Sequence, residues 1–158
     1  MNPRPILICY DGSENSKQAV TRAADLFPDQ PAIVLHVWEP LKDAASVPPV
    51  PGLYGMLEAG LEEMDKIGDE VSARTAAEGA EQAKAAGLGA EPLSVSAPGR
   101  AWRNILKVAR DRDVPAIVVG QRGIGGAERT LLGSVSTAVV HHADRPVVVV
   151  PAERAAGC

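Results

Sequence analysis

The sequence predicts an α/β protein in which four helices cover a doubly wound, five-stranded parallel sheet in a single domain. Short apolar runs alternate with longer segments of helical period, as in a parallel sheet buried on both faces. The chain has 158 residues. A single domain of this length buries enough surface to fold without disulfide bonds or a structural metal. The runs expected to form strands are ILICY (6–10), AIVLHVW (32–38), EPLSVSA (91–97), AIVVG (116–120) and PVVVV (146–150).

Four segments of helical period separate these runs. The first follows Ser13, the expected N-cap, and the second is a long helix that ends at Gly87. The second helix is marked by Leu57, Leu61, Met64, Ile67 and Val71, the third by Trp102, Ile105, Leu106 and Ala109, and the fourth by Leu132, Val135 and Val139. In a doubly wound sheet of this kind, ligands bind beyond the carboxyl ends of the strands, where the winding reverses.

Two segments fall outside the regular alternation. Four prolines between residues 40 and 51 predict that residues 40–56 form an extended surface loop. Residues 152–158 follow the last strand and are expected to be a tail. The predicted domain therefore spans residues 1–151.

Composition excludes several classes of function. The net charge is −4, the basic residues are scattered, and there are five aromatic residues, which argues against a nucleic-acid binder. No apolar run approaches the ~18 residues of a membrane span. Cys9 and Cys158 are the two cysteines, and Cys9 lies in a predicted buried strand, so we expect no stapling disulfide and a cytoplasmic protein.

The stretch GQRGIGGAERTLLGSVS, residues 120–136, contains five glycines and leads into a predicted helix. A helix start offers free N–H groups and the positive end of a dipole, so it suits an anion such as phosphate. Arg122 and Arg129 could add charge-assisted hydrogen bonds. The alternative is a structural glycine-rich turn capped by Ser134. Neither the P-loop nor the GxGxxG spacing is present, because no lysine precedes Ser134 and position 128 is Glu.

The spacing of Gly120, Gly123, Gly133 and Ser134 resembles the G-2x-G-9x-G-(S/T) motif of ATP-binding members of the universal stress protein family. ILICYDGSENSKQAV, AIVLHVWEP and VSTAVVHHADRPVVVV are similar to other parts of that family. The resemblance implies a Rossmann-like fold of the adenine nucleotide alpha hydrolase type. It also implies that the chain binds ATP, with Mg²⁺ or Mn²⁺, and forms a homodimer through the last strand, Val147, Val148, Val149 and Val150.

By this resemblance the glycines and Ser134 would hold the phosphates, Asp11 would contact the ribose or the metal-nucleotide unit, and the Val37 backbone would meet the adenine. The alternative for Asp11 is an N-cap or turn aspartate. The nucleotide-binding residues expected from the loop and the resemblance together are Asp11, Val37, Gly120, Arg122, Gly123, Gly133, Ser134, Val135 and Ser136.

Other reactive residue types receive structural interpretations. His36 is expected to be a core histidine bonded to backbone, and His141 and His142 to be helix-end residues. Cys9 has no base nearby in sequence. With no catalytic set to assemble, we expect a nucleotide-dependent stress-response or signalling module with slow or no ATP hydrolysis. The alternatives are an ATP-dependent hydrolase or transferase, a binder of another adenine nucleotide such as cyclic AMP, and a structural dimer with an empty cleft.

Overall fold

The computed structural model describes residues 3–41, 54–122 and 132–153, and within them it contains the five strands and four helices that the sequence predicts. Each strand lies within two residues of its predicted bounds. Gly123, Arg129 and most of the proline-rich segment lie outside the described residues. The elements are β1 (Ile6–Cys9), α1 (Glu14–Leu26), β2 (Pro31–Trp38), α3 (Tyr54–Ala85), β3 (Gly89–Ser96), α4 (Ala101–Asp111), β4 (Ile117–Gly120), α5 (Ser134–His142) and β5 (Val147–Val150).

The five strands form one parallel sheet in the order β3-β2-β1-β4-β5. The chain winds outward from β1 to β3 on one side and then returns to place β4 against the other side of β1. The winding therefore reverses between β1 and β4. This is the position at which a doubly wound sheet leaves room for a ligand.

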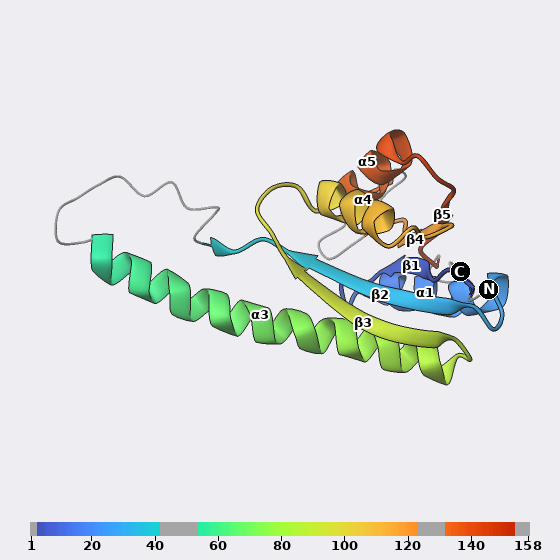
Figure 1. Ribbon diagram of the computed structural model, residues 1–158, viewed down its shortest axis with the longest axis horizontal. Coiled ribbons are helices and arrows are strands. Elements are labelled where there is room, and N and C mark those ends of the chain that lie inside the picture. The colour runs from blue at the N-terminus through green and yellow to red at the C-terminus, as the bar shows by residue number, and fades with distance from the viewer. Residues whose placement is uncertain (1–2, 42–53, 123–131, 154–158) are drawn as a thin grey trace, which may run out of the picture.

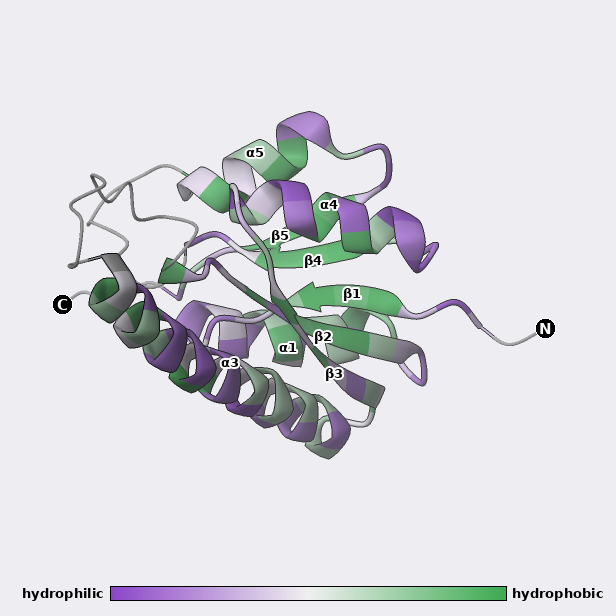
Figure 2. Ribbon diagram, turned by 60° about the vertical axis from the view of Figure 1, so that its left-hand side comes forward, coloured by the Kyte–Doolittle hydropathy of each residue, from purple (hydrophilic) through white to green (hydrophobic). Residues whose placement is uncertain are grey.

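Helices cover both faces of the sheet (Figure 1). α1 and α3 lie on one face, over a core that includes Ile8, Val34 and Val118. α4 and α5 lie on the other, over a core that includes Leu7, Ile33 and Ile117. Alternate residues of the same strands enter the two cores, so the inner strands β1 and β4 are apolar along their length (Figure 2).

Local chemistry explains where α1 begins and where α3 ends. The Ser13 hydroxyl accepts a hydrogen bond from the Ser16 N–H at 3.2 Å, which confirms Ser13 as the N-cap of α1. Gly87 has φ of +99°, which favours glycine. Leu88 N–H donates to the Ala83 carbonyl and Gly87 N–H to that of Lys84, both at 3.0 Å. These two bonds form a Schellman motif that stops α3.

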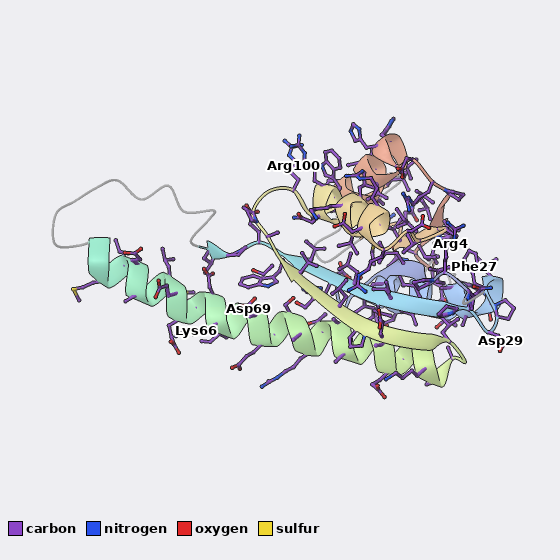
Figure 3. The ribbon with its side chains drawn as sticks, in the orientation of Figure 1. Arg4, Phe27, Asp29, Lys66, Asp69 and Arg100 are labelled. Carbon is purple, nitrogen blue, oxygen red and sulfur yellow. The ribbon has the colours of Figure 1, made fainter. Side chains whose placement is uncertain are left out.

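The face of α3 that packs on the sheet is not the face that carries its large apolar residues. Leu57, Met64, Ile67 and Val71 are all exposed, and this half of the helix extends past the sheet, where Lys66 and Asp69 also project (Figure 3). The residues of α3 that pack on the sheet are small ones, such as Ala76, Ala80 and Ala83. The helix begins at Tyr54, so residues 54–56 are helical and the expected loop over 40–56 is too long.

Two glycines allow α3 to approach the sheet closely. A Cβ at Gly68 would lie 2.5 Å from the ring of Trp38, and a Cβ at Gly79 would lie 2.7 Å from the ring of Tyr10 and 2.8 Å from Val34. Real Cβ atoms do not approach carbon this closely, so any side chain at these positions requires the helix or the ring to move.

We therefore expect Gly79→Ala to lower the free energy of unfolding by about 1–3 kcal/mol, because overpacking outweighs the better helix propensity of alanine. Gly60→Ala is the matched control, since a Cβ there meets nothing within 4 Å. It should raise stability by up to about 1 kcal/mol. Urea denaturation measures both changes, and a stabilising Gly79→Ala would contradict the close packing.

Candidate functional site

One cavity of about 470 Å³ opens at the carboxyl ends of β1, β2 and β4. It is a size that suits small-molecule ligands. Every described residue of the predicted site lines it: Asp11, Val37, Gly120, Arg122, Gly133, Ser134, Val135 and Ser136. Gly123 lies outside the described residues.

The cavity has an apolar side and a polar side because of the strand order. β2 and α4 contribute apolar groups, including Leu35, Val37 and Ile105. β4 and the start of α5 contribute Arg122 and the backbone of residues 133–136. β1 lies between β2 and β4, so Asp11, which follows β1, lies between the two sides. Sequence reasoning placed Ile105 in a helix core and missed that it also faces the cavity.

The first turn of α5 forms the polar side. Gly133 is the N-cap residue, with φ of −61° and ψ of 163° and no side-chain cap. The cap at Ser134, which belonged to the structural-turn alternative, is therefore wrong, because Ser134 is the first residue of the helix. Thr137 N–H donates to the Gly133 carbonyl at 2.9 Å. The N–H groups of Ser134, Val135 and Ser136 precede it and have no intrahelical acceptor, which suits an anion.

Gly133 permits a close approach of backbones and does not adopt an unusual φ. Its N–H donates to the Gln121 carbonyl at 2.7 Å, and a Cβ at Gly133 would lie 3.3 Å from the same oxygen. The Ser136 hydroxyl lies 3.0 Å from that carbonyl and 3.0 Å from the Gly133 carbonyl. The residues that follow β4 and the start of α5 are thus held side by side.

Asp11 has a role in the local turn and also lines the cavity. Its Oδ1 accepts a hydrogen bond from the Ser13 N–H at 3.0 Å, which forms the turn that sequence reasoning gave as the alternative. Gly12 has φ of +80°, a conformation that favours glycine. One carboxylate oxygen thus holds the turn while the side chain borders the cavity.

His36 and Cys9 also line the cavity. His36 Nδ1 lies 2.8 Å from the Tyr10 carbonyl. A carbonyl only accepts, so Nδ1 carries the hydrogen, and the expected bond to backbone is confirmed. Burial, with a smaller effect of Asp11, raises the pKa of the Cys9 thiol to about 12. A thiol of this pKa is protonated at neutral pH and is a poor nucleophile.

The packing of α4 against α5 accounts for the positions of His141 and His142. His141 and His142 end α5, as expected, and the His142 ring stacks on Trp102 with a centroid separation of 4.5 Å and an interplanar angle of 14°.

Among the described residues, no group of three His, Cys, Asp or Glu side chains could hold a metal ion. No helix in the described part of the chain is long and apolar enough to cross a membrane.

The model of the universal stress protein family matches residues 2–151. The chain belongs to the universal stress protein family. A universal stress protein of Bacillus subtilis is 33% identical over 149 residues, which cover 92% of this chain and 97% of the relative. One of Thermus aquaticus is 31% identical over 149 residues, covering 93% and 98%.

Solved structures show the same fold. A hypothetical protein whose biochemical function was assigned from its structure has a TM-score of 0.76 and 21% identity, covering 98% of this chain and 100% of that chain. The universal stress protein of Archaeoglobus fulgidus in complex with dAMP has a TM-score of 0.61 and 20% identity, covering 95% and 99%. A universal stress protein in complex with cAMP has a TM-score of 0.58 and 21% identity, covering 96% and 98%.

The state of Cys9 gives a direct prediction. In a Cys158→Ser background, Cys9 is the single thiol. Its pKa is raised from 9.0 to about 12, so we expect its reaction with iodoacetamide at pH 8 to be roughly a thousandfold slower in the native protein than in urea. Mass spectrometry of timed samples measures the two rates. Equal rates would show that the thiol is not held protonated.

Proposed function

We propose that this chain binds an adenine nucleotide, ATP, in the cavity at the switch point, and that occupancy acts as a signal rather than as a source of chemical work. The observation that supports this proposal is that the eight described residues of the predicted site border one cavity. They come from strands and a helix that lie far apart in the sequence.

The two sides of the cavity suit the two ends of a nucleotide. An adenine fits against apolar side chains such as Leu35 and Ile105, next to the Val37 backbone. The phosphates fit the polar side, where the free N–H groups of α5 and the Arg122 guanidinium favour negative charge. The nucleotides bound by two structural neighbours, dAMP and cAMP, also join an adenine to a phosphate.

Asp11 fits a nucleotide that carries its own cation. A lone carboxylate beside phosphates is unfavourable unless a cation or a ribose hydroxyl lies between them. Mg²⁺ is commonly held by one or two carboxylates and the phosphates of the substrate, and it retains waters. Asp11 would supply that carboxylate or accept a hydrogen bond from the ribose. We propose that Mg²⁺ or Mn²⁺ enters with the nucleotide.

The same residues argue for a signalling module over the alternative of an ATP-dependent hydrolase or transferase. Phosphoryl transfer needs a group that orients water or a second substrate. Among the described residues of the cavity, the Cys9 thiol is protonated and is a poor nucleophile. His36 donates from Nδ1 to the Tyr10 carbonyl and keeps Nε2 as its one proton acceptor. The half-buried free thiol of Cys9 also suits a reducing compartment, and we propose the cytoplasm.

Asp11→Asn tests the nucleotide site with the turn preserved. Asparagine retains an oxygen that accepts from the Ser13 N–H, but it lacks the charge. We expect the unfolding free energy to change little and the affinity for ATP to fall about tenfold or more, because hydrogen bonds to a charged group contribute ~1.5–3 kcal/mol. Calorimetric titration with and without Mg²⁺ shows whether the loss requires the metal.

The parent chain supplies the control for this experiment. It should bind ATP, and mass spectrometry after denaturation should identify any adenine nucleotide that it retains on purification. Tighter binding of cAMP than of ATP would support the cyclic nucleotide alternative. Absence of binding to ATP, AMP and cAMP would contradict the proposed function and favour a structural dimer.

We also propose that two copies pair through β5. This strand is an edge of the sheet. Ile117 N–H donates to the Pro146 carbonyl and Gln121 N–H to the Val150 carbonyl, so the even-numbered residues of β5 bond to β4. The backbone groups of Val147 and Val149 therefore point toward the open edge, where a second strand can pair. The other edge strand, β3, contains Pro92, which suits an edge that stays unpaired.

Val149→Pro tests this pairing without charging the core. The substitution removes an N–H that points away from β4, a position at which an edge strand tolerates proline. Lysine at Val148 or Val150 would be less informative, because those side chains pack into the core with α1. We expect the parent to have a dimeric mass and Val149→Pro a monomeric mass in light scattering. A dimeric variant would place the interface elsewhere.

A further inference from the structure

We propose that Asn15, in the first turn of α1, is a positioning residue that fixes the backbone on the phosphate side of the cavity. The inference rests on the proposed function, because it concerns how the same site holds phosphate. Asn15 does not line the cavity. It acts through the backbone of Arg122, which does.

The Asn15 side chain joins three elements. It is 8% exposed. Its Oδ1 accepts a hydrogen bond from the Arg122 N–H at 2.7 Å, and its Nδ2 donates to the Val150 carbonyl at 3.2 Å. A backbone N–H only donates and a carbonyl only accepts, so these partners fix the orientation of the amide. One buried side chain thus links α1 to the residues after β4 and to the end of β5.

Gly120, the first glycine of the family motif, makes room for this amide. A Cβ at Gly120 would lie 3.0 Å from Asn15 Oδ1, 3.1 Å from Asn15 Cγ and 3.2 Å from the Asn15 carbonyl oxygen. The φ of Gly120 is not in the left-handed region. The approach of Asn15 therefore favours glycine at this position.

The backbone that Asn15 holds directly follows β4 and adjoins the start of α5. Gln121 N–H donates to the Val150 carbonyl at 2.8 Å, and the Gln121 carbonyl accepts from the Gly133 N–H at 2.7 Å. These two bonds tie Gln121 to β5 and to the start of α5. Asn15 adds two more bonds at the same place, because it accepts from the Arg122 N–H and donates to the same Val150 carbonyl.

A positioning role and a purely structural role of Asn15 predict different losses of ligand affinity when the side chain is removed. Asn15 contacts the β4 and β5 side, whereas the proposed adenine surface is formed by β2 and α4. Loss of positioning should therefore weaken binding of the phosphates and spare binding of the nucleoside. General destabilisation should affect ATP and adenosine equally, or neither.

Asn15→Ala, titrated with ATP and with adenosine, separates these cases. We expect the affinity for ATP to fall about tenfold and that for adenosine to stay within about twofold of the parent. Val20→Ala is the matched control, since it removes buried packing from the same helix away from the cavity. It should lower the melting temperature and leave both affinities unchanged. Unchanged ATP affinity in Asn15→Ala, or equal losses for both ligands, would overturn the proposal.

Hydrogen exchange of the Arg122 amide, followed by NMR in the nucleotide-free protein, gives a second readout. The amide should be protected in the parent and in Asn15→Asp, which retains an acceptor oxygen, and it should exchange rapidly in Asn15→Ala. Rapid exchange in the parent would overturn the proposal even if Asn15→Ala fails to fold. If the parent binds no adenine nucleotide, the proposed function itself is wrong. If the parent and Asn15→Ala bind ATP with equal affinity, only this inference is wrong.

Discussion

The site depends on the divergence of the chain after two neighbouring strands. β1 and β4 pair side by side, yet α1 leaves β1 toward one face of the sheet and α5 follows β4 on the other. No helix can cover the edge at which the two paths separate, so a crevice forms there. The cavity, the Asp11 turn and the start of α5 are all consequences of this one reversal of winding. The residues around it determine what the crevice can hold.

Sequence patterns predicted what depends on local chemistry. The strands follow from β-branched runs, and Ser13 and Gly87 act as the cap and the stop that their residue types suggest. The cavity residues were predicted through the spacing of the glycine motif, which carries family information that physical reasoning on the loop alone does not contain. That reasoning left phosphate binding and a structural turn both open.

Long-range packing determined what the patterns missed. Leu57, Met64 and Val71 mark an apolar stripe, but α3 turns another face, made of small residues, toward the sheet: Ser72 is buried against Ser94 of β3 while the adjacent Val71 is exposed. Asn15 is separated from Arg122 by 107 positions, and a polar residue in a first helical turn normally indicates only solvent. The glycines also serve the protein itself: Gly120 and Gly133 let protein groups approach one another, so a bound ligand is not needed to explain either one.

The Trp102–His142 stack joins the helix on the apolar side of the cavity to the helix on its polar side. The other of the two tryptophans, Trp38, ends β2 on the opposite face of the sheet and packs over Gly68. Both indoles thus belong to elements that border the cavity, one on each face. The tryptophan fluorescence of the unlabelled chain, excited where tyrosine does not absorb, therefore comes from two elements that border the cavity and gives the protein a built-in optical probe of both.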